Sequence, residues 1–318
     1  MDAVIDIGSN SVRLMTEDGR AVNRKTLAST ALADGLALTG YLSDEAMDRT
    51  AAAIRSFAAE ARRRGAENVY IFGTEAMRAA KNGKTFKARI EKENGLPVDV
   101  ISGETEARLG LIGAAGDAAG EVTVIDIGGA SVEIIRGGKD RITYAKSAPL
   151  GMVRLIDLVG SEKTAIERFI ERELPVFGIV SGTDDAIAIG GTATSLASMD
   201  LDQTVYNPDE THGHVLTLAS LSRLRDEIFS TRDLISRFPT LTPNRARVIG
   251  HGAIMLLSLV EYLGIDGVTV SEHDNMEGYL AYIRNEKQSS KQNPVRIYLA
   301  RFFRLFRSTD FPISSVRA

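Results

Sequence analysis

Short apolar runs alternate with segments of helical spacing along the chain. Runs rich in Val and Ile that stop at a polar or glycine-rich turn have the length and composition of strands. Such runs are found at 3–17 (a pair), 21–28, 68–72, 97–101, 124–134 (a pair), 141–146, 186–189 and 268–271. Apolar positions at helical spacing, with Ser or Thr-Pro at the expected starts, predict helices at 43–64, 161–178, 242–263 and 274–284, and a further helix is predicted to start at Ser102. This alternation predicts an α/β protein.

One strand-turn-strand pattern occurs twice. Residues 4–14 align without gaps on residues 124–134, and seven of the eleven positions are identical. Both copies place an aspartate, Asp6 or Asp126, next to last in an apolar strand that runs into a glycine. We interpret the match as an internal duplication. It predicts two related domains, residues 1–117 and 118–285, with the Gly- and Ala-rich stretch 113–120 as their boundary.

The two turns are suited to binding phosphate. Gly128-Gly129 between two β-rich runs indicates a hairpin, in which both central positions can require a positive φ. Such a turn presents backbone N–H groups without side chains in the way, which suits phosphate oxygens. Asp126 at the strand end would face a metal or a water molecule near that phosphate. Two such hairpins facing each other across a cleft would form a clamp.

Further strand-to-helix junctions are candidate sites. The run 68–72 ends at Gly73-Thr74, where a helix carrying Arg78 is predicted, and this is a usual place for ligand contacts in α/β sheets. The run 186–189 ends at Gly190-Gly191-Thr192, which either cradles a phosphate or forms a tight turn with a Thr or Ser helix cap. Gly83-Lys84-Thr85 lacks the earlier glycine of a phosphate-loop motif, so we interpret it as a loop and helix start.

Composition excludes several classes of protein. The 318 residues include no cysteine, so disulfides and thiol chemistry are excluded, and a reducing cytoplasm is expected. No long, purely apolar run indicates a membrane span. The net charge is −4, and residues 287–318 contain seven Lys or Arg and one acid, so the remainder is strongly acidic. An acidic body argues against general nucleic-acid binding.

The C-terminal tail, 286–318, has a different pattern. Residues 287–293 are polar and predict a linker. Residues 295–307 place aromatic and aliphatic side chains on one helical face and four arginines opposite. Such a helix can lie on an anionic membrane surface or dock on the protein's own acidic body or a second subunit. We favour docking on protein, and expect a homodimer.

Four motifs in order carry a family resemblance. The two Asp-Ile-Gly hairpins, the segment Ser102-Gly-x-x-Glu106-Ala-Arg and the late Gly190-Gly-Thr-Ala together resemble the exopolyphosphatase / guanosine pentaphosphate phosphohydrolase (Ppx/GppA) family, over roughly residues 1–285. The resemblance implies two ribonuclease-H-like domains of actin-like fold around a central cleft. It also implies Mg²⁺ as the cofactor and a phosphate-rich substrate.

Residue roles follow from this resemblance by position. Glu106 matches the proposed catalytic base, and Asp126 and Glu133 match the acids implied to hold Mg²⁺ and the attacking water. The residues implied to meet phosphate are Asp6, Gly8, Ser9, Asn10, Ser11, Arg13 and Arg78. The glycine turns add Gly128, Gly129, Ser131, Gly190, Gly191 and Thr192 as candidate phosphate-binding residues.

Three positions depart from the family pattern. Ala130 and Val132 replace a glycine and a threonine of the second hairpin, and Met276 replaces an arginine near the C-terminus. An alanine at a positive-φ position would cost on the order of 1 kcal/mol.

The sequence therefore predicts a Mg²⁺-dependent hydrolase that releases terminal phosphate from inorganic polyphosphate or guanosine pentaphosphate. Two alternatives stay open. One is an ATP-dependent kinase of the same superfamily, with Gly190-Gly191-Thr192 holding adenosine. The other is a sensor that binds polyphosphate or alarmone without turnover, an alternative kept because the second hairpin departs from the family pattern.

Overall fold

The computed structural model describes residues 1–17, 23–116, 120–138, 141–181 and 185–292, with side chains described up to residue 285. Residues Met1–Tyr279 form one compact unit and Leu280–Ala318 a second. The predicted boundary at 117/118 and the basic helix at 295–307 lie outside the described residues.

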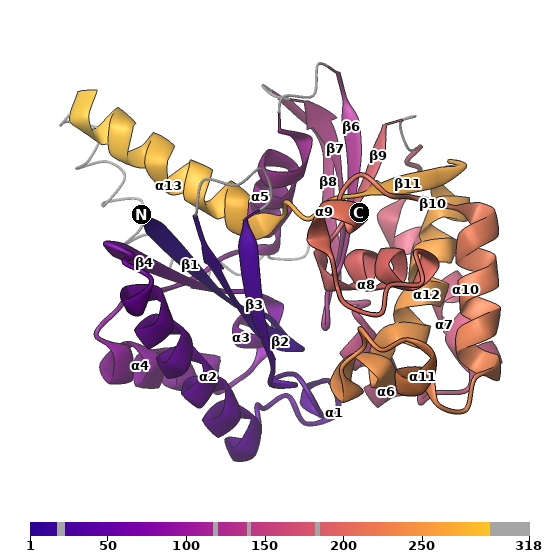
Figure 1. Ribbon diagram of the computed structural model, residues 1–318, viewed down its shortest axis with the longest axis horizontal. Coiled ribbons are helices and arrows are strands. Elements are labelled where there is room, and N and C mark those ends of the chain that lie inside the picture. Colours follow the sequence, from indigo (N-terminus) through magenta and orange to yellow (C-terminus); the bar gives the residue numbers. More distant parts are fainter. Residues whose placement is uncertain (18–22, 117–119, 139–140, 182–184, 293–318) are drawn as a thin grey trace, which may run out of the picture. The chain divides into compact units, whose positions relative to one another are not determined.

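Two mixed sheets share one strand order (Figure 1). The first sheet runs β3-β2-β1-β4-β5, formed by β1 (Asp2–Ile7), β2 (Ser11–Thr16), β3 (Arg24–Ser29), β4 (Asn68–Gly73) and β5 (Val98–Val100). The second runs β8-β7-β6-β9-β11-β10, formed by β6 (Val122–Ile127), β7 (Val132–Gly138), β8 (Arg141–Ala148), β9 (Ala186–Ile189), β10 (Val215–Thr217) and β11 (Gly267–Val270). In each sheet the repeated strand, β1 or β6, is antiparallel to the next strand and parallel to β4 or β9. The predicted duplication is therefore confirmed in the topology.

Helices connect the strands and cover the sheets. Those of the first half are α1 (Leu36–Thr39), α2 (Asp44–Arg63), α3 (Glu75–Ala79), α4 (Gly83–Asn94) and α5 (Gly103–Ala115). Those of the second half are α6 (Met152–Val159), α7 (Lys163–Glu173), the 3₁₀ turn η1 (Leu174–Phe177), α8 (Gly190–Asp200), α9 (Pro208–Thr211), α10 (Leu218–Ser230), α11 (Leu234–Arg237), α12 (Pro243–Leu263) and α13 (Asn275–Gln292). The caps predicted at Ser43 and Ser102 and the helix start predicted at Thr242-Pro243 are confirmed, since the side chains of Ser43, Ser102 and Thr242 each accept a backbone N–H in the first turn of their helix. Gly83 begins α4, as predicted for a helix start.

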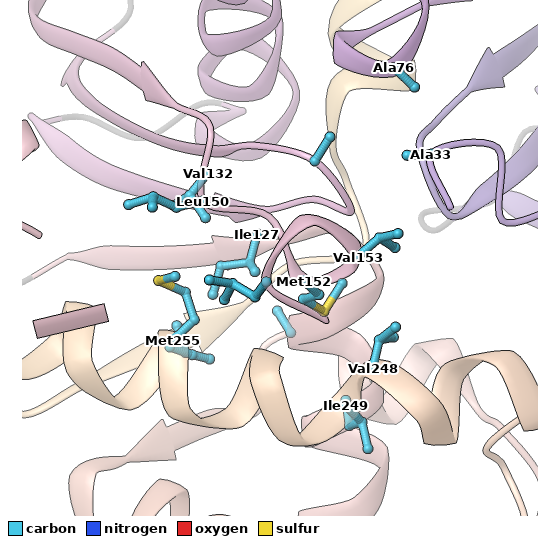
Figure 2. Close-up of a cluster of buried hydrophobic side chains, with 14 of the residues drawn as sticks. Ala33, Ala76, Ile127, Val132, Leu150, Met152, Val153, Val248, Ile249 and Met255 are labelled. Carbon is cyan, nitrogen blue, oxygen red and sulfur yellow. The ribbon is translucent and has the colours of Figure 1, made fainter. Parts of the chain in front are cut away.

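One continuous hydrophobic core joins the two sheets and includes the ends of both β1 and β6. Ile7 and Ile127, at equivalent strand ends, are buried in one cluster with residues of both sheets. In Figure 2, Ile127 and Met152 lie above α12, which contributes Val248 and Met255. Helix α12 is long and apolar enough to cross a membrane, but 72% of that stretch is buried inside the protein. Its apolar character is therefore that of a core helix.

Two regions differ from the sequence prediction. Helix α13 continues to Gln292 through the predicted linker. Glu, Lys and Gln are good helix formers even in a segment that has no apolar residues at helical spacing. Gly113, predicted in a domain boundary, lies inside α5. A Cβ there would collide with the carbonyl oxygen of Asp274, and one at Gly278 of α13 would collide with that of Leu109. These glycines let α5 and the start of α13 approach closely.

Candidate functional site

The two hairpin turns are built alike. The N–H of Gly8 donates to the carbonyl of Ser11 (3.1 Å), and the N–H of Gly128 donates to that of Ser131 (2.9 Å). The strand register sets Asp6 opposite Arg13 and, at the equivalent place, Asp126 opposite Glu133. The repeated sequence thus produces one local geometry with different charges.

The predicted reason for the turn glycines is wrong. None of Gly8, Gly128, Gly129 and Ala130 has a positive φ. Gly129 is needed because the two hairpins meet there: an added Cβ would lie 2.8 Å from Cβ of Ser9 and 3.0 Å from the backbone nitrogen of Asn10. The backbone cost predicted for Ala130 therefore does not arise, since alanine adopts its conformation freely.

Both hairpins line a single narrow cavity of about 70 Å³. It collects most of the candidate residues predicted from the sequence, namely Asp6, Gly8, Ser9, Asn10, Ser11, Arg13, Glu106, Asp126, Gly128, Gly129, Ser131, Gly190 and Gly191. Asp6 and Asp126, more than one hundred residues apart, thus share one cavity. Arg78, Glu133 and Thr192 are not among the lining residues.

These three residues lie immediately behind the lining. Arg78 donates to Glu106 Oε2 (Nη2 at 3.3 Å) and to the carbonyl of Ile101, so it holds Glu106 from outside. Glu133 is buried and accepts from the Ser147 hydroxyl at 2.6 Å. Thr192 is buried and donates to the carbonyl of Ile127 at 2.8 Å, which ties α8 to the end of β6. It does not cap α8, whose N-terminus has no side-chain cap.

The carboxylates of this region are held in an unfavourable environment for negative charge. The pKa values of Glu106 and Asp126 are raised well above their usual range, mainly because both carboxylates are buried and secondly because Glu133 repels them. Burial raises the pKa of Glu133 to about 7 despite its hydrogen bond from Ser147. A bound cation or a proton would relieve this repulsion.

The cationic side of the cavity has two arginines. Arg13 on β2 pairs with Asp6 Oδ2 (2.6 Å) and with Asp274 Oδ2 (2.5 Å). Arg245, in the first turn of α12, lines the cavity against Gly191, where a Cβ would collide with its guanidinium. Arg245 makes no ion pair with any residue that the structure describes. Its pKa is lowered to about 10, mainly because the guanidinium is buried and secondly because Arg13 repels it. An unpaired guanidinium at the start of α8 is a binding group for an anion.

Sequence reasoning missed Arg245 because no motif surrounds it. It also missed the acidic start of α13. Asp274 pairs with Arg13 and with Lys25 of β3 (3.0 Å), and Asn275 donates to Asp126 Oδ2 at 3.0 Å. Burial alone would raise the pKa of Asp274, but the charges of Arg13 and Lys25 outweigh it and hold that pKa well below the usual range. These contacts fix the side chains of both hairpins from a third element.

Three buried oxygen atoms of the cavity lining lack a hydrogen-bond partner among the described residues. They are Asp6 Oδ1, Asn10 Oδ1 and Asn275 Oδ1. A buried acceptor without a donor costs about 1–3 kcal/mol. A ligand, hydrated cation or water network in this cavity would satisfy them.

The duplicated α/β fold and this site define a class of protein. Two hairpin turns, an arginine with no ion-pair partner among the described residues and the buried carboxylate of Glu106 line one cavity, an arrangement suited to a phosphohydrolase of two-domain actin-like fold. The comparison with known families agrees. The model of the Ppx/GppA phosphatase family matches residues 13–285, and the chain belongs to this family.

Characterised relatives and solved structures cover most of the chain. Exopolyphosphatase 2 of Mycobacterium tuberculosis is 32% identical, over 87% of this chain and 96% of its own. Guanosine-5'-triphosphate,3'-diphosphate pyrophosphatase of Pseudoalteromonas translucida is 31% identical, over 91% of this chain, which spans only 60% of that relative's length. The crystal structure of the Aquifex aeolicus Ppx/GppA family member superposes with a TM-score of 0.73 at 29% identity, covering 90% of this chain and 98% of that one.

Proposed function

We propose that the protein releases the terminal phosphate of inorganic polyphosphate, of guanosine pentaphosphate, or of both. The observation that carries this proposal is the convergence of both hairpin turns, Glu106 and Arg245 on one cavity. Hydrolysis of a phosphoanhydride needs an in-line water and donors for the equatorial oxygens, and little else from the protein.

The chain's own residues can supply these needs. Backbone N–H groups of the turns other than those of Gly8 and Gly128, which bond within the turns, would stabilise the charge that develops on the phosphoryl oxygens, together with Arg13 and Arg245. Glu106 lies at the cavity wall on α5, where its carboxylate can accept a proton from water, and burial raises its pKa above the usual range, which makes it a stronger base. Arg78 fixes its position from behind. Asn275 orients Asp126 by donating to its carboxylate.

The carboxylate donors fit Mg²⁺. Asp126 and Glu133 offer hard oxygen ligands from facing positions of one hairpin, and each has a raised pKa that a cation would lower. No cluster of three or more potential ligands occurs among the described residues, and Mg²⁺ is usually bound through one or two carboxylates with water and substrate phosphates completing the shell. When bound, Mg²⁺ would neutralise charge on the substrate phosphates.

The test is phosphate release from polyphosphate and from guanosine pentaphosphate, measured in parallel with and without Mg²⁺. We expect release from at least one substrate, lost on chelation and restored by Mg²⁺. Tight binding with Mg²⁺ but no released phosphate would select the sensor alternative. Loss of ATP that depends on an added acceptor would select the kinase alternative.

A further inference from the structure

Arg13 belongs to a row of buried charges that continues away from the cavity. The row alternates in sign through Asp6, Arg13, Asp274, Lys25 and Glu277, and each of these side chains is less than one-fifth exposed. Arg13 and Lys25 both pair with one oxygen, Asp274 Oδ2, at 2.5 Å and 3.0 Å. Lys25 Nζ also lies 3.0 Å from Glu277 Oε2. Lys25 is not among the residues that line the cavity, so its connection to the site runs through Asp274.

The first sheet brings the two cations of this row together. Arg13 pairs with Leu27 across β2 and β3, so Lys25, two residues from Leu27, projects from the same face as a diagonal neighbour of Arg13. Like charges at such positions repel each other. The Asp274 carboxylate forms an ion pair with both, and α13 holds it in place, because its other oxygen accepts the Met276 N–H at 2.9 Å.

The hydrogen bonds of Arg13 leave part of its guanidinium for a ligand. Its Nε and Nη2 donate to Asp6, and its Nη1 donates to Asp274. One hydrogen on each terminal nitrogen is therefore left for an anion in the cavity. The positive charge of Arg13 is nevertheless flanked by two carboxylates. Lys25 supplies the second cation that balances them, and charges at buried positions are only weakly screened by water and salt.

We infer that Lys25 is a positioning residue for phosphate binding, which neutralises Asp274 and so keeps Arg13 an effective partner for an anion. The inference rests on the proposed function and assigns a role in it to a residue outside the cavity. Without Lys25, the carboxylates of Asp6 and Asp274 would outnumber Arg13, and an approaching phosphate would meet a group of net negative charge. Substrate binding would weaken, whereas Glu106 on α5 would keep its position.

The first measurement compares Lys25→Met with Lys25→Arg, which keeps the charge. Phosphate release is measured from whichever of polyphosphate and guanosine pentaphosphate the parent chain hydrolyses. We expect Lys25→Met to raise KM about tenfold and to leave kcat within about threefold, and Lys25→Arg to stay near the parent. Lys163→Met, which removes an exposed pair with Asp226, is the control and should leave both constants unchanged. An unchanged KM in Lys25→Met would overturn the inference.

A second variant separates the charge of Lys25 from its contacts. The three donors of Lys25 bind Asp274, Glu277 and the carbonyl of Glu272, so its loss also loosens the start of α13. The double variant Lys25→Met/Asp274→Asn restores the charge balance but removes further contacts of α13. We therefore expect its KM to return to within about threefold of the parent. A KM above that of Lys25→Met would show that the contacts matter rather than the charge, and would overturn the inference.

Binding of inorganic tripolyphosphate, measured by calorimetry, gives a readout that needs no turnover. We expect Kd to be about tenfold higher for Lys25→Met and near the parent value for the double variant. If Lys25→Met does not fold, Asp274→Asn alone decides: relief of one carboxylate beside Arg13 should preserve or tighten binding, and weaker binding would overturn the inference. A parent chain that binds tripolyphosphate but releases phosphate from no substrate would instead overturn the proposed function, while the Kd comparison still tests Lys25.

Discussion

Asp126 and Glu133 face each other directly across β6 and β7, at the register where the first hairpin sets Asp6 against Arg13. Like charges directly opposite on neighbouring strands are destabilising, whereas an Asp–Arg pair is stabilising. The first hairpin therefore neutralises its own aspartate. The second leaves two buried carboxylates, neither of which forms an ion pair with a described residue.

This pair predicts how stability depends on pH in the absence of divalent cations. The pKa of Glu133 rises from an ordinary 4.5 to about 7 on folding, so the folded chain holds that proton more tightly than the unfolded chain. The stabilisation is complete below pH 4.5 and is lost as the pH rises through about 7. We expect the free energy of unfolding to fall over this range, by on the order of 3 kcal/mol at most from this group. Chemical denaturation at several pH values in chelator measures it.

Glu133→Gln provides the matched comparison. It should flatten the decline between pH 5 and pH 8, and added Mg²⁺ should flatten it in the parent chain. Glu171→Gln, an exposed carboxylate on α7, should leave the profile unchanged. An identical decline in the Glu133→Gln chain would show that this residue is not its source.

Glu106→Gln should separate binding from turnover. The amide keeps the size of the side chain but cannot accept a proton from water, so kcat should fall by about 10²–10⁴ with little change in KM. Glu104→Gln, two residues earlier on the exposed face of α5, is the control and should behave as the parent. Steady-state phosphate release measures both constants. Near-normal turnover in the Glu106 variant would remove this residue from the mechanism.

Arg245→Gln should weaken substrate binding. Its guanidinium makes no ion pair with a described residue, so its removal frees no protein carboxylate and takes away only a charged hydrogen bond to phosphate. Such a bond contributes about 1.5–3 kcal/mol, and kcat/KM should fall at least tenfold. Arg247→Gln on the same helix removes an exposed pair with Asp34 and should have little effect. Equal losses in the two variants would argue against a specific role for Arg245.

Gly129→Ala should force the two hairpins apart. The new Cβ would lie 2.8 Å from Ser9 Cβ, closer than carbon atoms pack, and overpacking of this kind costs about 1–3 kcal/mol. We expect a lower thermal midpoint and a large loss of activity. Gly120→Ala, where an added Cβ meets nothing within 4 Å, is the control for the loss of a glycine. A variant with parent-like stability and activity would show that the contact between the hairpins can relax at no cost.

The fold could be predicted from the sequence because the internal duplication is visible in it. Residues 4–14 and 124–134 match closely enough to fix two equivalent hairpins, and the sheet order around each followed the same pattern. The helix starts at Ser43, Ser102 and Thr242 were predictable for a local reason, since capping depends on the residue and its next turn alone. Polar helix formers near residue 290 gave no apolar periodicity, so the length of α13 was not predictable in this way.

Only part of the candidate site could be predicted from the sequence. Residues inside a motif were found, but Arg245, Lys25 and Asp274 reach the cavity or its arginines through tertiary contacts that leave no local pattern. The role of Gly129 was misassigned for the same reason: its close neighbour, Ser9, is 120 positions away in the sequence. Thr192 looked like a phosphate ligand because a glycine pair precedes it, yet its hydroxyl is used by the carbonyl of Ile127.

The glycine contacts between α5 and α13 have a mechanical consequence. Gly113 of α5 lies against the backbone of Asp274, and Gly278 of α13 lies against the backbone of Leu109, so close backbone packing sets the spacing between Glu106 and the Asn275 amide that donates to Asp126. We therefore expect any opening or closing motion to leave the distance between Glu106 and Asn275 unchanged, with its hinge elsewhere in the chain.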